Sequence, residues 1–246
     1  MTMGINPSGG GKPDYLTRPS PNFGPRAPDK PIDILLIHYT GMASAEAALD
    51  RLCDPASQVS AHYLIEEDGT IWSLVDEQHR AWHAGIGYWA GEADINSHSI
   101  GIELVNPGHE LGYRPFPMPQ MVALAGMARE IMARHKIPNH RVLGHSDVAP
   151  ERKCDPGELF DWAWLAAQGV GIWPESPVRS NGGDTADDLR RIGYKVEGDV
   201  PSGAVVTAFQ RHFRPSLIDG QLDWETRDSI AAVAEMIPLE DGYYAT

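Results

Sequence analysis

The sequence has few cysteines, no long apolar run and a shortage of basic residues, and each shortage excludes a class of protein. Its 246 residues include only Cys53 and Cys154 as cysteines, too few for a scaffold held together by disulfides. No run approaches the roughly 18 apolar residues that a membrane span needs, so we expect no membrane span. With 20 basic against 34 acidic residues, the net charge of −14 disfavours binding to nucleic acid or anionic membranes.

The first thirty residues lack both apolar character and a regular pattern. Residues 1–30 are polar and rich in glycine and proline, which predicts an irregular leader. They contain no apolar core of the kind that a secretory signal requires. We therefore expect a cytoplasmic protein, with the periplasm or cell envelope as the alternative if a signal has been removed. The sequence leaves the oligomeric state open.

The rest of the chain divides into two parts of different character. Residues 31–168 alternate between strand-like and helix-like patterns, and residues 169–183 are a predicted linker. This alternation predicts an α/β domain with a central mixed β-sheet flanked by helices. Residues 184–240 predict a small C-terminal three-helix module. The expected strands cover 32–37, 61–65, 70–75, 99–105 and 141–144, and the expected helices cover 45–52, 119–135, 158–167, 184–192, 201–212 and 223–236.

Residues 144–157 are the most informative segment. They read Gly-His-Ser-Asp-Val-Ala-Pro-Glu-Arg-Lys-Cys-Asp-Pro-Gly and contain His145, Lys153 and Asp155. A second histidine, His38, ends the apolar run over residues 34–37. Two histidines and a carboxylate form a ligand set for a catalytic zinc ion, which keeps its fourth position for water. Lys153 is placed to neutralise an oxyanion that forms there.

Each candidate has a structural alternative. A lone histidine is commonly a hydrogen-bonded structural residue, and Asp155 is also suited to capping a helix that begins near residue 157. Cys154 is a candidate ligand if the site is a closed structural zinc site. A carboxylate such as Glu103, set in an apolar strand, needs a partner or a shifted pKa, which favours a catalytic role. The candidates for lining the substrate groove are His62, Trp82 and His83, each of which is also compatible with a structural role.

Five blocks occur in an order that identifies a family. They are Leu-Leu-Ile-His-Tyr-Thr (35–40), Val-Ser-Ala-His-Tyr-Leu-Ile (59–65) with Asp-Gly-Thr-Ile (68–71), Ala-Trp-His-Ala-Gly (81–85), Ser-Ile-Gly-Ile-Glu-Leu (99–104) and the segment 144–157. Over residues 30–170 the chain resembles the zinc-dependent N-acetylmuramoyl-L-alanine amidases of the AmpD and AmiD type. Their fold is shared with peptidoglycan recognition proteins and phage T7 lysozyme. The C-terminal part resembles a peptidoglycan-binding module, although it lacks the usual Asp-Gly turn in its first segment.

The resemblance implies a function and a role for each site residue. It implies Zn²⁺ held by His38, His145 and Asp155, with Glu103 and Lys153 as catalytic residues. The reaction implied is hydrolysis of the amide between the lactyl group of N-acetylmuramic or 1,6-anhydro-N-acetylmuramic acid and L-alanine of the stem peptide. The partners implied are peptidoglycan fragments or the sacculus. The alternative is a noncatalytic peptidoglycan receptor on the same fold, which would typically lack one ligand that this chain retains.

Overall fold

The fold is built on a mixed β-sheet. The computed structural model describes residues 15–175 and 184–239. The strands are β1 (Leu16–Thr17), β2 (Phe23–Pro25), β3 (Ile34–Tyr39), β4 (Tyr63–Ile65), β5 (Ile71–Ser73), β6 (His79–Ala81), β7 (Ser99–Leu104) and β8 (Val142–Gly144). Six of them form the main sheet in the order β1-β5-β4-β7-β3-β8, and β2 pairs with β6 in a small antiparallel ribbon.

Helices surround this sheet, as the alternating sequence pattern predicts. They are α1 (Ala45–Cys53), α2 (Ile95–His98), α3 (Gly108–Leu111), α4 (Met118–His135), α5 (His145–Val148), α6 (Trp162–Ala167), α7 (Thr185–Ile192), α8 (Gly203–Phe213) and α9 (Trp224–Met236), with short 3-10 helices at Pro55–Ser57 and Asn139–Arg141. The helix expected over 158–167 begins later, because Asp161 caps it by accepting a hydrogen bond from the Trp164 amide. Within the described ranges, no helix is both long and apolar enough to cross a bilayer.

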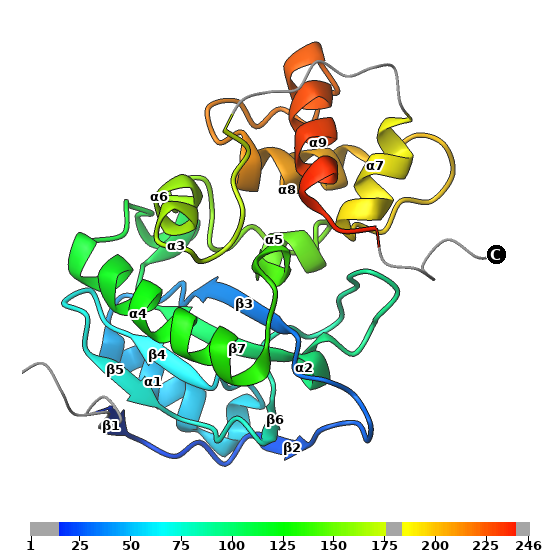
Figure 1. The fold of residues 1–246 in the computed structure, drawn as a ribbon. Coiled ribbons are helices and arrows are strands. Elements are labelled where there is room, and N and C mark those ends of the chain that lie inside the picture. Colours follow the sequence, from blue (N-terminus) through cyan, green and yellow to red (C-terminus); the bar gives the residue numbers. More distant parts are fainter. Residues whose placement is uncertain (1–14, 176–183, 240–246) are drawn as a thin grey trace, which may run out of the picture.

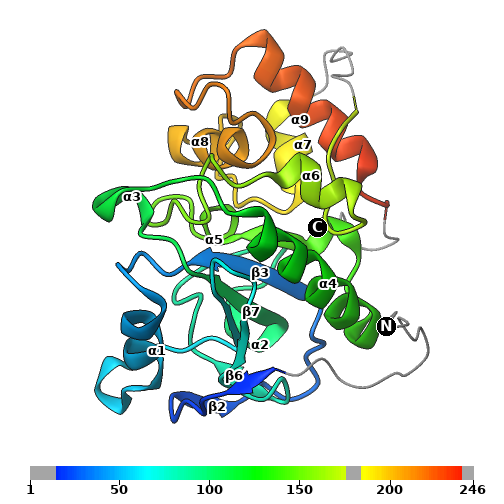
Figure 2. The same ribbon diagram turned by 90° about the vertical axis from the view of Figure 1, so that its left-hand side faces the viewer.

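Strand β3 lies at the centre of the parallel part of the sheet, between β7 and β8. Its residues 34–37 are fully buried on both faces, which explains their unbroken apolar run. Leu35 and Ile37 point into the core formed with α4, whereas Ile34 and Leu36 point into a second core on the opposite face. Figure 2 shows α1 and α4 on opposite sides of the sheet.

The three predicted C-terminal helices are present as α7, α8 and α9, here called the C-terminal helical unit (residues 184–239). They gather beside α5 at one side of the sheet domain (Figure 1). Their apolar side chains, such as Leu189 and Phe209, share one buried core with Leu36 and Leu143 of the sheet. The division into an amidase domain over 31–168 and a module over 184–240 remains a prediction. The core between these two parts is continuous.

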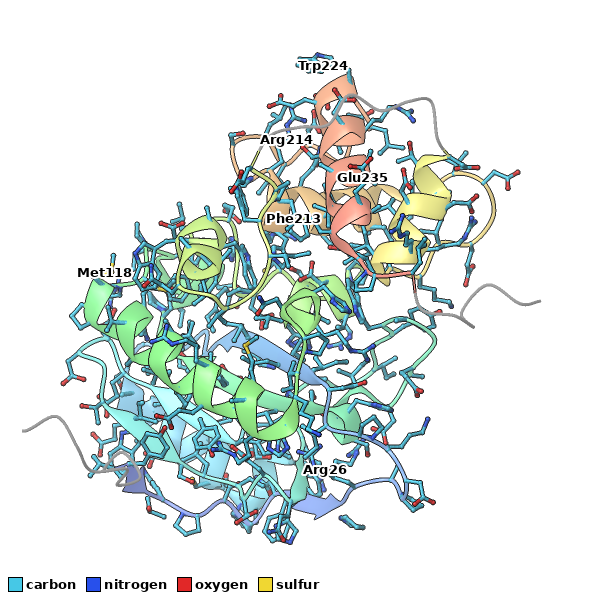
Figure 3. All side chains as sticks on the ribbon, in the orientation of Figure 1. Arg26, Met118, Phe213, Arg214, Trp224 and Glu235 are labelled. Carbon is cyan, nitrogen blue, oxygen red and sulfur yellow. The ribbon has the colours of Figure 1, made fainter. Side chains whose placement is uncertain are left out.

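The leader differs from the expectation of an irregular segment over residues 1–30. Strand β1 pairs in parallel with β5, and β2 pairs with β6. Short edge strands tolerate proline, because one side of an edge strand makes no ladder hydrogen bonds. Arg26, labelled in Figure 3, ties the segment down by donating to the carbonyls of Asn96, Ser97 and Ser99. Residues 1–14 of the predicted leader and 176–183 of the predicted linker lie outside the described residues.

The carboxylate of Glu77 joins the β4 region to the end of α4. Burial alone would raise its pKa, but hydrogen bonds from Arg134, His135 and Tyr63 outweigh burial and lower the pKa from 4.5 to about 2. The contacts are short, at 2.8 Å, 2.6 Å and 2.7 Å. Ionised Glu77 therefore stabilises the fold above its unfolded-state pKa, and this contribution is lost as the pH falls from about 4.5 toward 2.

We expect Glu77→Gln to lower the free energy of unfolding at pH 7 by about 2 kcal/mol. This value is smaller than the pKa shift alone implies, because the Arg134 partner is half exposed and solvent screens its charge. The difference from the wild type should shrink as the pH falls below 4.5, the ordinary pKa of the carboxyl. Urea unfolding at several pH values measures it. Glu67→Gln is the control, because the ion pair of Glu67 with Arg114 is exposed and should contribute little to stability. A difference that does not change with pH would contradict this account.

Candidate metal centre and active site

The register of three neighbouring strands places the principal site residues side by side. His38 on β3 lies opposite Glu103 on β7, and Ile37 lies opposite Gly144 on β8. His145, the next residue after Gly144, therefore reaches the same level as His38. Because the strands are parallel, all three residues lie toward one end of the sheet, where α/β proteins place their chemistry. The sequence predicted His145 at a strand end; it is also the first residue of α5.

Three side-chain atoms converge at this level. The Nδ1 atoms of His38 and His145 are 2.9 Å apart, and each lies 3.1 Å from Oδ2 of Asp155. All three residues are buried, with 1%, 3% and 6% of their surfaces exposed. Among the described residues they form a group of His and Asp side chains able to hold a metal ion. The structure therefore brings together the complete ligand set expected from the sequence.

The hydrogen bond of its Nε2 atom sets the tautomer of His145. Its Nε2 atom lies 2.9 Å from the carbonyl oxygen of Ala84, which can only accept a hydrogen bond. Nε2 therefore carries a proton, so that in the neutral imidazole it is Nδ1 that presents its lone pair toward His38 and Asp155. Such a partner on the far nitrogen is the usual companion of a metal-binding imidazole.

A longer chain of hydrogen bonds sets the protonation of His38. The Ser99 hydroxyl donates to the Ile95 carbonyl at 2.6 Å, so it accepts from Nε2 of His83 at 3.3 Å. Nδ1 of His83 is then an acceptor, and the Nε2–H group of His38 donates a hydrogen bond to it at 3.0 Å. The His38 Nδ1 atom is left with a lone pair that faces the site.

This arrangement fits a cation. Two imidazole lone pairs and a carboxylate oxygen meet within hydrogen-bonding distance, and none of the three atoms has a proton to share. Burial, followed by the neighbouring His145, lowers the pKa of His38 to about 4, so its imidazole is neutral at pH 7. Burial disfavours the ionised form of Asp155, but the charge and hydrogen bonds that His145 and His38 offer when they are protonated outweigh it and hold the pKa of Asp155 well below the usual range. Neutral imidazoles and an ionised carboxylate are the forms that bind metals.

A glycine on β7 makes room for His83. A Cβ atom on Gly101 would lie 2.5 Å from the His83 ring, far inside van der Waals contact. Gly101 occurs within the strand Ser-Ile-Gly-Ile-Glu-Leu, where an interior glycine otherwise weakens a strand. Sequence reasoning missed the parts played by Gly101 and Ser99. The interior glycine is the signal that indicates a close approach at this point.

Glu103 is an isolated carboxylate beside the ligand group. Its Oε2 atom is buried and has no hydrogen-bond partner among the described residues. Burial, reinforced by the charge of Asp155, raises its pKa well above 4.5, while Lys153 opposes the shift. An ionisable group with a raised pKa in a cleft is suited to proton transfer near neutral pH.

An open cleft of about 630 Å³ gives access to these residues, a size typical of ligand sites. Glu103, Lys153, Trp82 and His83 all line it, together with the three ligand residues. It lies on the face of the sheet that carries α1, and Arg51 of α1 forms part of its wall. The cleft is therefore lined both by the candidate site residues and by residues of α1.

His62 lies elsewhere, contrary to the expectation that it lines the groove. It has no exposed surface and accepts a hydrogen bond from the Gly101 amide at 2.9 Å. Its other ring nitrogen contacts Arg26 at 3.0 Å. Burial, followed by the charge of Arg26, lowers its pKa to about 3. The structure thus places His62 behind His83, with no atom facing the cleft. Trp82 and His83 reach the cleft, and their contact with substrate remains a prediction.

The fold and the three converging atoms define an α/β protein with a candidate metal centre in an open cleft. A family model described as N-acetylmuramoyl-L-alanine amidase matches residues 28–158. The chain is 40% identical to the N-acetylmuramoyl-L-alanine amidase AmiD of Escherichia coli (strain K12) over 236 residues, covering 83% of each protein. The chain therefore belongs to the N-acetylmuramoyl-L-alanine amidase family, as the five sequence blocks predicted.

Solved structures agree with this assignment along most of the chain. One is similar with a TM-score of 0.74 at 39% identity, covering 86% of this chain and 92% of the other. It is E. coli AmiD in complex with the substrate anhydro-N-acetylmuramic acid-L-Ala-D-gamma-Glu-L-Lys. Another, AmpDH3 of Pseudomonas aeruginosa in complex with an anhydromuramic pentapeptide, has a TM-score of 0.78 at 31% identity and covers 97% of this chain and 100% of its own.

We expect Gly101→Ala to weaken the binding of an added metal ion, with Zn²⁺ as the probe, about tenfold or more, because the new Cβ would displace His83 from His38. Gly126→Ala is the matched control, since nothing lies within 4 Å of a Cβ added there. On helix propensity it should stabilise the protein by about 0.5–1 kcal/mol. Competition with a chelator measures both affinities. Equal zinc affinity in the two variants would contradict the role assigned to Gly101.

Proposed function

We propose that this protein hydrolyses the amide bond between the lactyl group of N-acetylmuramic or 1,6-anhydro-N-acetylmuramic acid and L-alanine of the stem peptide. The observation that carries the proposal is the meeting of two imidazole nitrogens and a carboxylate oxygen beside Glu103, whose Oε2 atom has no hydrogen-bond partner within the described residues. Family membership and two relatives with bound anhydromuramyl peptides support it.

The metal in this proposal is zinc, held by His38, His145 and Asp155. Two histidines and one carboxylate are a ligand set that zinc hydrolases use, with a fourth position left for water. A bound zinc ion supplies Lewis acidity, which polarises a carbonyl and lowers the pKa of water. The protein contributes neutral imidazoles and an ionised carboxylate, held in place by Ala84 and His83.

Glu103 is the general base in this mechanism. Its raised pKa places proton uptake closer to neutral pH than an ordinary glutamate would allow. It takes a proton from the attacking water and passes it to the departing amide nitrogen of L-alanine. Its Oε2 atom accepts no hydrogen bond from the residues that the structure describes, which leaves it available to take that proton.

Lys153 stabilises the negative charge that develops on the carbonyl oxygen. It lines the cleft two residues before Asp155. Its charge already acts on the site, because it opposes the rise in the pKa of Glu103. Loss of one donor to an oxyanion typically slows turnover by about 10²–10³-fold.

The C-terminal helical unit is proposed to bind peptidoglycan strands, with the amidase domain over 31–168 and the binding module over 184–240. Besides the sequence resemblance, this rests on Trp224 at the start of α9, which is 73% exposed. Figure 3 shows Trp224 at the end of the unit that is farthest from the sheet domain. An exposed indole ring offers a large apolar face on which a sugar ring can stack.

We expect Glu103→Gln to lower kcat by about 10²–10⁴-fold while zinc stays bound, because the amide cannot accept the proton. In the wild type, kcat/KM should fall on the acid side as Glu103 becomes protonated. The midpoint of this fall in kcat/KM should lie above pH 4.5, the ordinary pKa of the carboxyl. The residual activity of the variant should not show this fall. Steady-state kinetics and metal analysis measure these effects. Near-native turnover of a zinc-loaded variant would exclude Glu103 as the base.

The function itself is tested by mass spectrometry of the zinc-loaded protein incubated with anhydro-muramyl tripeptide and, in parallel, with intact sacculi. We expect free peptide to be released and the release to stop on chelation. Preference for the soluble fragment would assign the protein to recycling in the cytoplasm, and preference for sacculi would assign it to the envelope. If the zinc-bound protein releases peptide from neither substrate, the result would favour the alternative of a noncatalytic peptidoglycan receptor.

The same assay tests the binding module. Trp224→Ala should reduce cosedimentation with sacculi and leave hydrolysis of the soluble fragment unchanged, because Trp224 is not among the residues that line the cleft. Equal cosedimentation of the variant and the wild type would remove Trp224 from the proposed binding surface.

A further inference from the structure

Asp147 is a buried carboxylate two residues after the metal-ligand candidate His145. Only 1% of its surface is exposed, so its charge needs partners inside the protein. One partner is local, because the Gly144 amide donates to Oδ2 of Asp147 at 2.7 Å. This contact closes the turn from β8 into α5, the turn on which His145 is placed. The position of Asp147 therefore sets the direction in which α5 begins.

The other partners of Asp147 come from the C-terminal helical unit. The Tyr194 hydroxyl donates to Oδ1 at 2.6 Å, and Nδ1 of His212 lies 2.7 Å from Oδ2. Both residues are buried, with 2% and 3% of their surfaces exposed. Burial, followed by the charge of Asp147, raises the pKa of Tyr194 well above its ordinary value, so its hydroxyl is a donor throughout the physiological range.

The two donors are themselves held firmly. The His212 ring stacks on Trp162 of α6 with centroids 3.8 Å apart and planes 19° apart. Tyr194 meets Trp89 edge-on at 4.9 Å. Figure 3 shows Phe213, the residue after His212, on the side of the unit that faces the sheet domain. Aromatic packing of this kind leaves Tyr194 and His212 little freedom to move away from Asp147.

The backbone at this junction is also closely fitted. The Ala90 amide donates to the Gly193 carbonyl at 2.8 Å. Gly193 has a φ of +132°, and a Cβ there would lie 2.4 Å from the Trp89 ring. Together with the shared apolar core, this contact joins the unit to the sheet domain over a continuous surface. A module that is merely tethered by a linker does not require such a fit.

We propose that Tyr194 and His212 are positioning residues for the metal centre, so that the C-terminal helical unit completes the site that binds zinc. They act through Asp147: its carboxylate, held from both sides, keeps the β8–α5 turn in the orientation that directs His145 toward His38 and Asp155. The anchor on the other side of His145 is the Ala84 carbonyl at 2.9 Å. The inference rests on the zinc site of the proposed function. It adds a second task for the helical unit besides binding the wall.

The test compares two tyrosines that lose the same interaction. Tyr194→Phe removes a buried hydroxyl that donates to Asp147 at 2.6 Å, and Tyr63→Phe removes one that donates to Glu77 at 2.7 Å on the other face of the sheet. We expect both full-length variants to fold with a lower Tm. Only Tyr194→Phe should weaken Zn²⁺ binding, by about tenfold, in competition with a chelator. A general loss of stability would affect zinc affinity in both variants alike.

Asp147→Asn is the second variant, because it keeps the shape of the side chain but removes the charge that faces three donors. It should weaken zinc binding at least as much as Tyr194→Phe does. Wild-type affinity in a folded Tyr194→Phe and Asp147→Asn would overturn the positioning role while leaving the amidase intact. A wild-type protein that binds no zinc would overturn the proposed function, and the positioning role with it.

Discussion

The mutual repulsion of three electron-rich atoms is the constraint on which the site depends. Two imidazole nitrogens lie 2.9 Å apart, and a carboxylate oxygen lies 3.1 Å from each, on side chains that are almost entirely buried. Without a cation such an arrangement is unfavourable, so the surrounding structure must hold it in place. Fixed partners do this: the Ala84 carbonyl, the His83–Ser99 chain and, by our proposal, Asp147 with the helical unit.

The two faces of the sheet divide structural and chemical tasks. One face packs fully against α4 in an apolar core, and this gives the strands a rigid support. The other face is shared among α1, the open cleft and the core with the C-terminal helical unit. Because strand residues alternate between faces, His38 and Glu103 lie on the shared face while their neighbours Ile37 and Ile102 anchor them from the opposite side.

Much of the fold could be predicted from periodicity and turn chemistry. Serine is a common helix-capping residue, and Ser44 caps α1. An Asp-Gly pair is a strong turn signal, and Asp68-Gly69 lies between the antiparallel strands β4 and β5. Within the described part of the predicted leader, the expectation of an irregular segment was wrong at β1 and β2, because their pairing with β5 and β6 depends on strands that lie far along the chain. His62 shows the same limit. Its residue type suits a groove, but in the folded protein it is buried and accepts a hydrogen bond from the Gly101 amide of β7.

The sequence by itself determined the chemistry available to this protein: two histidines, an aspartate, a glutamate and a lysine at strand ends and in one loop. These assignments follow from residue types and short spacings. Only the tertiary structure decided which nitrogen of His38 and His145 carries a proton. It also decided that Asp147 is held by Tyr194 and His212, which lie 47 and 65 positions further along the chain. The reason is physical, because hydrogen-bond partners are chosen by proximity after folding, and no local pattern records those distances.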